Sequence, residues 1–149
     1  MKFMLIPASI LAFISVTALA ADAQQATVSN TWFRALPSGL PAGGYFNLTN
    51  HGSAPLTLIG ASSPACGMLM LHRSESENGV SRMMDVPRVD IAPNQTMHFA
   101  TGGYHLMCMK PTAAMKPGAT VDVTLQFEKG PNITAPFEVR NAQGMPQMH

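Results

Sequence analysis

Four metal-binding side chains lie within five residues of one another in the segment GGYHLMCM, residues 102–109. They are His105, Met107, Cys108 and Met109. Side chains alternate faces along a strand, so a strand here would place His105 and both methionines on one face and Cys108 on the other. An imidazole and a thioether two residues apart on one face can bind the same ion. The segment therefore predicts part of a metal site with an apolar face behind it.

The segment MLMLHRS, farther up the chain, repeats this arrangement. On a strand, Met68, Met70 and His72 would share one face, and the two leucines between them would share the other. The polar turn ESENG follows, and VSRMM then brings Met83 back along a neighbouring strand. Such a hairpin would hold His72 and Met83 near one rim of the domain. By the same alternation Met84 points away from Met83, and we expect it in the core.

Histidine and methionine together favour copper over the other biological metals. Thioethers are soft, neutral ligands that select Cu(I), and imidazole suits Cu(I) and Cu(II) alike. Without carboxylates the set is poor for Ca²⁺, Mg²⁺ or Mn²⁺, and structural Zn²⁺ takes cysteine and histidine. Thioethers also suit an oxidising compartment, because they form no disulfide and need no deprotonation. We expect Cu(I) to be the main ion bound, with weaker binding of Cu(II).

Short apolar runs separated by Gly, Pro and Asn turns follow one another from residue 24 onward. This spacing is typical of an antiparallel all-β domain. The clearest run is TVDVTLQF, whose alternate residues form one apolar face: Val121, Val123, Leu125 and Phe127. No helical period and no internal repeat is evident beyond the N-terminus. We predict a single domain over residues 24–140, folded as a two-sheet Greek-key β-sandwich.

The N-terminal residues 1–23 have the features of a secretory signal peptide. Lys2 precedes an apolar stretch, and small-x-small signals predict cleavage after Ala20 or Ala23. An uncleaved membrane anchor is the alternative. No later stretch has the ~18 apolar residues that a membrane span needs. We therefore expect an exported protein with no stable membrane span, located in the periplasm of a bacterium.

Charge and motif content exclude several classes of function. The chain has 9 Lys+Arg against 8 Asp+Glu and no basic run, so nucleic acid and anionic lipid are poor partners. We find no nucleophile elbow, no HExxH motif and no convincing acid–base pair. The sequence therefore predicts a binding protein and not an enzyme.

The spacing of the candidate ligands resembles a known family. His72, ten residues, Met83, twenty-one residues and then His105-x-Met107 match the His-x10-Met-x21-His-x-Met signature of the periplasmic copper chaperones called PCuAC. The GGYHLM run and the Lys/Pro loop before PGATVDVTLQFEKG also resemble family features. The resemblance covers about residues 26–138.

The resemblance implies a fold, a site and a function. It implies a cupredoxin-like β-sandwich that binds one Cu(I) near its surface through His72, Met83, His105 and Met107. It also implies delivery of copper to the dinuclear copper site of cytochrome c oxidase, through the copper-site subunit or its assembly factors. We expect the chain to act as a monomer. Met70 and Met109, on the same predicted faces, are candidates for transient contact with copper.

Cys66 and Cys108 leave one structural question open. An even cysteine count in an exported protein makes a disulfide plausible. On an unbroken strand, however, Cys66 shares the face of His72, whereas Cys108 points into the core. A bulge at Gly67 would reset this alternation. The sequence does not decide between the bridge and two separate thiols.

Three other interpretations stay open. The tail NAQGMPQMH has no periodicity, so we expect residues 141–149 to be loose. The sequence does not decide whether Met145, Met148 and His149 form a second weak copper site or have no role. Copper buffering or resistance without a dedicated acceptor would use the same main site. An electron-transfer cupredoxin would need a thiolate beside two histidines, and Cys108 faces away from His105 by alternation.

Overall fold

The computed structural model describes residues 25–146, and these residues form an all-β domain. The described elements are β1 (Ala26–Arg34), a short 3-10 helix η1 (Pro37–Gly39), β2 (Ala42–Asn50), β3 (Leu56–Ser62), β4 (Cys66–Glu77), β5 (Val80–Asp85), β6 (Val89–Ile91), β7 (Thr96–Phe99), β8 (Tyr104–Pro111), β9 (Thr120–Phe127) and β10 (Ile133–Arg140). Every apolar run expected to form a strand does so. The predicted fold class is confirmed, while the expected signal peptide lies outside the described residues.

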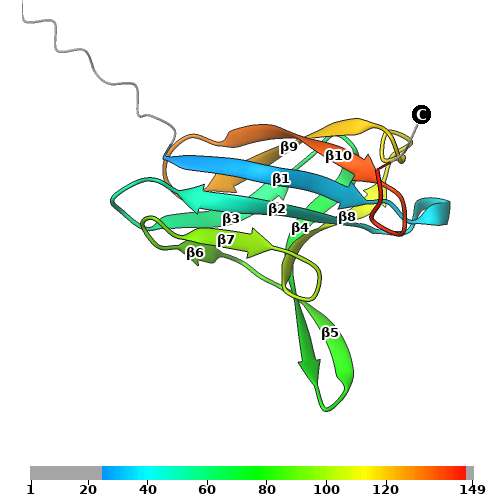
Figure 1. Ribbon diagram of the computed structural model, residues 1–149, viewed down its shortest axis with the longest axis horizontal. Helices are drawn as coiled ribbons and strands as arrows, with labels where there is room; N and C mark the ends of the chain where they lie inside the picture. The colour runs from blue at the N-terminus through cyan, green and yellow to red at the C-terminus, as the bar shows by residue number, and fades with distance from the viewer. Residues whose placement is uncertain (1–24, 147–149) are drawn as a thin grey trace, which may run out of the picture.

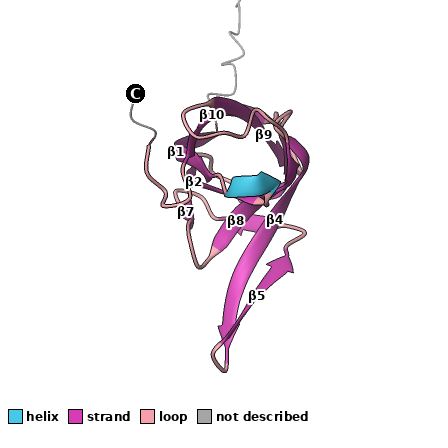
Figure 2. Ribbon diagram, turned by 90° about the vertical axis from the view of Figure 1, so that its right-hand side faces the viewer, coloured by secondary structure: helices cyan, strands magenta, loops and turns pink. Residues whose placement is uncertain are grey.

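The strands join in one continuous hydrogen-bonded sheet. Its order is β5-β4-β8-β2-β1-β10-β9-β3-β6, and β7 pairs with β2. The path curls around the core, so the two predicted layers are parts of one sheet (Figure 2). The pairing is antiparallel except between β1 and β10, which run parallel. That parallel pair departs from the purely antiparallel prediction and places the first and last strands of the domain side by side.

The core lies inside this curled sheet and follows the expected alternation. Val121, Val123, Leu125 and Phe127 are all buried, while the residues between them are half-buried or exposed. Phe33, Phe46 and Phe137 pack beside them, and none is more than 1% exposed. Burial of each such side chain contributes roughly 1.5–3 kcal/mol. The core therefore gives a rigid backing to the strands that carry the candidate site.

Strands β4 and β5 form a hairpin that projects from the body of the domain (Figure 1). Its turn is Asn78-Gly79, with φ angles of 53° and 77°, as the tightest hairpin turns require. The sequence predicted a longer turn over ESENG, but β4 continues to Glu77. Because β5 extends beyond the core, all six of its residues are exposed. The expectation that Met84 lies in the core is therefore wrong, since it is 45% exposed.

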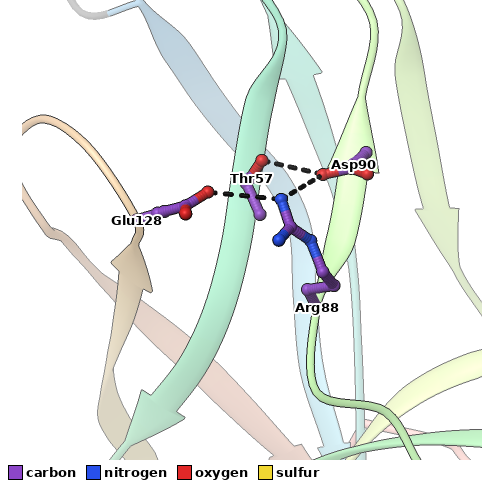
Figure 3. Close-up of polar contacts among 4 residues, drawn as sticks. All are labelled: Thr57, Arg88, Asp90 and Glu128. Atoms are coloured by element: carbon purple, nitrogen blue, oxygen red, sulfur yellow. Dashed lines mark hydrogen bonds and ion pairs between the residues drawn. The ribbon is translucent and has the colours of Figure 1, made fainter.

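A polar cluster ties β6 to β3 and to the end of β9 (Figure 3). The Thr57 hydroxyl donates a 2.8 Å hydrogen bond to Oδ1 of Asp90. The Arg88 guanidinium lies 3.4 Å from the same oxygen and 3.3 Å from Oε2 of Glu128. The Thr57 hydrogen bond, with a smaller effect from Arg88, holds the pKa of Asp90 below its usual value. Because these charges are exposed, the cluster contributes little to stability.

The two cysteines form a disulfide, which answers the question that the sequence left open. Cys108 is fully buried, as alternation predicted, and its Cα lies 5.3 Å from that of Cys66. The regular pleat breaks beside the bridge. Lys110 has a left-handed φ of 50°, and a Cβ atom on Gly67 would lie 2.9 Å from the Lys110 Cβ. With this irregularity Cys66 bonds to Cys108 on the core face, although regular alternation would place Cys66 on the same face as His72.

The first residues of the tail form a closed turn. Oδ1 of Asn141 accepts hydrogen bonds of 3.0 Å from the backbone N–H groups of Gln143 and Met145. Gly144 lies against the Trp32 ring with a left-handed φ of 75°. The expectation of a loose tail is therefore wrong for residues 141–145. Met145 is exposed, whereas Met148 and His149 lie outside the described residues.

Candidate metal centre

Strands β4 and β8 bring the histidines and methionines together as three directly opposed pairs. The pairs are Met68 with Met109, Met70 with Met107, and His72 with His105. Directly opposed residues have Cβ atoms about 4.5–5.5 Å apart. The alternate residues Leu69, Leu71, Leu106 and Cys108 are buried on the other face. The predicted faces of both segments are thus correct, and pairing of the two strands joins them into one.

His105 is held in a form that is ready to bind a metal. Its residue is 3% exposed, and its Nδ1 lies 3.0 Å from the carbonyl oxygen of Gly103, just before β8. A carbonyl oxygen only accepts, so Nδ1 carries the proton and donates, and Nε2 keeps its lone pair. Within residues 25–146, the buried Nε2 has no hydrogen-bond partner. That lone pair is available to a metal ion.

His72 lies directly across from His105, with the ring centroids 5.8 Å apart and the rings nearly perpendicular. Its side chain is 13% exposed, and Nε2 lies 2.8 Å from Oδ1 of Asp85. That contact lacks hydrogen-bond geometry, and both ring nitrogens are buried without a hydrogen-bond partner in the described structure. Together with Nε2 of His105, three buried imidazole nitrogens are therefore unsatisfied at one place.

Met83 stands at the rim of this arrangement. It lies opposite Ser74 on the hairpin, one diagonal step from His72, and is 61% exposed. Met83, His105 and Met107 line the same surface hollow of about 290 Å³. Three of the four predicted ligands thus lie side by side on β4 and β8, and the fourth faces them from the projecting strand.

Strand β2 closes the hollow on its other side with residues that the sequence did not single out. Gly43 pairs with Met107, and the Tyr45 side chain fills the space beside this glycine, because a Cβ atom there would lie 2.6 Å from the Tyr45 hydroxyl oxygen. The Tyr45 ring centroid is 6.5 Å from that of His105. Arg34 stacks on Tyr45 at 5.7 Å and also lines the hollow. In the sequence, the pair Gly43-Gly44 directly before Tyr45 was the signal that the Tyr45 side chain lies close against this backbone.

Asp85 is a further residue that the sequence did not assign to the site. A copper ion on Nε2 of His72 would compete with its carboxylate, which is a poor partner for Cu(I). Because an ion on Nε2 would displace this contact, Asp85→Ala is expected to raise Cu(I) affinity about two- to fivefold, as an exposed contact of ~0.2–1 kcal/mol allows. Chelator competition measures this change. A loss of affinity would instead show that Asp85 supports the bound state.

The electrostatics of His105 predict how the metal-free protein responds to acid. Burial lowers the pKa of His105 below its ordinary 6.5, the Gly103 hydrogen bond opposes this, and nearby His72 adds to it. The unfolded chain therefore binds a proton at His105 at a higher pH than the folded chain. The contribution of neutral His105 to the free energy of unfolding should therefore be complete above about pH 6.5. It should decrease as the pH drops toward the pKa of His105 in the folded protein.

Urea unfolding between about pH 7.5 and 5.5, an interval that spans the ordinary histidine pKa, measures this response. The parent should lose stability across the interval, and His105→Gln should lose less. The same pH dependence in both proteins would contradict the role given to His105.

The described residues offer no conventional alternative to a histidine–methionine site. Among residues 25–146, no group of three or more His, Cys, Asp or Glu side chains is placed to hold a metal ion. No helix in the same part of the chain is long and apolar enough to cross a membrane. The candidate ligands on β4 and β8 are imidazole and thioether groups.

Comparison with known proteins assigns the chain to a family. Residues 26–139 match the family model described as "Putative lipoprotein LpqE-like". The chain belongs to this LpqE-like family. It is also 32% identical over 118 residues to "Putative lipoprotein Lxx21020" of Leifsonia xyli subsp. xyli, a match that covers 78% of this chain and 70% of the relative.

Solved structures of PCuAC domains share the fold of this LpqE-like chain. The "Copper-bound PCuAC domain from PmoF2" superimposes with a TM-score of 0.66 at 22% identity, covering 78% of this chain and 93% of that one. The "Solution structure of CuI-DR1885 from Deinococcus Radiodurans" superimposes with a TM-score of 0.61 at 28% identity, covering 83% of this chain and 85% of that one. These likenesses confirm the expected cupredoxin-like fold.

Proposed function

We propose that this LpqE-like protein is a copper chaperone that binds one Cu(I) ion through His72, Met83, His105 and Met107. The observation that carries the proposal is the set of three buried imidazole nitrogens without hydrogen-bond partners in the described structure. Leaving such a group unsatisfied costs about 1–3 kcal/mol. A metal ion could take one nitrogen of each ring, which on His105 is the unprotonated Nε2.

The donor set and the structural neighbours support copper in particular. Neutral imidazole and thioether ligands prefer Cu(I), and Cu(II) is expected to bind more weakly. The titles of two neighbours describe a copper-bound PCuAC domain and a protein loaded with Cu(I). The spacing of the four ligands in this chain is the PCuAC signature given above.

The exposure of the site suits transfer of the ion. Met83 is 61% exposed on a strand without core contacts, while His105 is buried. An acceptor could therefore replace the Met83 thioether first and the buried ligands afterwards. This order of ligand exchange supports a chaperone that releases its cargo.

The protein would work outside the cytoplasm. The signal-peptide features of residues 1–23 and the lipoprotein description of the family favour export to the periplasm or the outer face of the membrane. The copper acceptor we propose is the dinuclear copper site of cytochrome c oxidase. The protein would reach it as a monomer, through the copper-site subunit or its assembly factors.

Transfer of copper to that acceptor tests the proposed function. The mature protein loaded with Cu(I) is mixed with the metal-free dinuclear-site domain of the oxidase, and the copper content of each is measured after separation. We expect copper to move to the oxidase domain, and deletion of the protein to impair oxidase assembly. Retention of the ion, with copper sensitivity alone on deletion, would favour a buffering protein.

A further inference from the structure

The row of thioethers on β4 and β8 continues past the proposed four-ligand site. Met70 lies opposite Met107, and Met68 lies opposite Met109. Neighbouring pairs are two residues apart along the strands, or roughly 6.6 Å at a rise of ~3.3 Å per residue. Four flexible thioethers thus share one patch of the sheet surface, next to the histidine pair.

Core packing does not account for these four methionines. Met115 is buried in the core and Met97 packs against it, as gap-filling methionines do. Within the described chain, the residues of the core and those packed against it include none of Met68, Met70, Met107 and Met109. Met68 is 57% exposed, and the other three are half-buried. A group of four partly exposed methionines on one face of the sheet needs another explanation.

We propose that Met68, Met70 and Met109 form a second Cu(I) subsite that borders the histidine site and shares Met107 with it. The proposal rests on the proposed function, because it extends the path of the same ion. A set of neutral thioethers selects Cu(I) and excludes Zn²⁺ and the hard cations. Without imidazole, the subsite binds Cu(I) more weakly than the histidine site does.

The backbone beneath the subsite is fixed. Cys108 lies between Met107 and Met109 in sequence, on the opposite face, and its disulfide to Cys66 joins β8 to the start of β4. A rigid backbone with mobile thioethers above it lowers the cost of gathering the sulfur atoms. Because Met107 belongs to both sets, an ion can pass between them by exchange of one ligand at a time. The subsite thus offers a second position for copper during loading or release.

Cu(I) titration of three mature proteins tests the proposal, against chelators of graded affinity and under a reductant that leaves the disulfide intact. They are the parent, Met68→Leu/Met70→Leu/Met109→Leu, and the matched control Met84→Leu/Met97→Leu/Met145→Leu. Methionine-to-leucine changes conserve side-chain volume, so all three proteins should fold alike. We expect the parent and the control to bind a second, weaker equivalent, and the subsite variant to bind only the first.

A second ion bound equally by the subsite variant and the parent would overturn the proposal. So would loss of that ion in the control, which would place it elsewhere, for example at the tail. Methyl NMR of labelled methionine in the parent gives a test without any variant: the second equivalent should shift the signals of Met68, Met70 and Met109. Retention of the first ion by Met83→Leu/Met107→Leu would refute the four-ligand site separately. Because Met107 belongs to both sets, the second ion is judged only from Met68→Leu/Met70→Leu/Met109→Leu, which keeps Met107.

Discussion

A protein carrying His105→Gln is expected to lose tight Cu(I) binding. Loss of an outer-shell partner of a metal site already costs ~10–100-fold in affinity, and removal of a ligand should cost at least the upper end of that range. The ring is the most deeply buried of the candidate ligands, at 3% exposure, and its Nε2 is unpartnered in the described structure. Chelator competition under reductant measures the affinity.

His72→Gln and His98→Gln complete this experiment. His72 is less buried than His105, so its replacement should weaken Cu(I) binding to a similar extent with less effect on folding. His98 is exposed on β7, and its Nδ1 lies 2.7 Å from Oδ1 of Asn47. It serves as the matched control. We expect His98→Gln to bind like the parent. Parent-like affinity in both His72→Gln and His105→Gln would refute the histidine site.

Removal of the disulfide is expected to give the largest loss of stability. The bridge closes a loop with a sequence separation of 42. Such a loop restricts the unfolded chain by about 4 kcal/mol in the chain-entropy treatment. Cys66→Ala/Cys108→Ala should therefore unfold at a much lower denaturant concentration than the parent. Urea unfolding of both metal-free proteins measures the difference.

The same variant separates stability from ligand chemistry. Neither cysteine belongs to the proposed ligand set, because Cys108 faces the core. Below its unfolding transition, Cys66→Ala/Cys108→Ala should still bind one Cu(I) tightly. Loss of copper from the folded variant would contradict this separation and would mean that the bridge is needed to hold the ligands in place. An unchanged unfolding midpoint would contradict the stabilising role of the bridge.

Much of the fold and of the candidate site followed from strand alternation alone. Period-two patterns identified the core face of β9 and placed His105 and Met107 together. They could not pair β4 with β8, because register depends on contacts between distant segments. The ligand spacing, taken as a resemblance, implied only that His72 and His105 bind one ion. The register of the two strands sets these histidines directly opposite each other.

The sequence did not predict the features that break the regular strand pattern. The left-handed backbone at Lys110, which lies close against Gly67, breaks the pleat beside the Cys66–Cys108 bridge. The outer end of β4 and all of β5 have no core contacts and therefore no apolar pattern. For this reason the length of β4 was underestimated and Met84 was wrongly expected in the core. Asp85 joined the site through the hairpin register, which the turn at Asn78-Gly79 sets.

The measurement that tests the central claim most directly is a Cu(I) titration of the mature protein and of Met83→Leu/Met107→Leu. These changes remove both thioethers of the proposed site while keeping their volume and the histidines. Chelator competition under reductant gives the affinity of the first equivalent. We predict one tightly bound ion in the parent and its loss in the variant. Equal tight binding by both proteins would contradict the four-ligand site and place copper elsewhere on the chain.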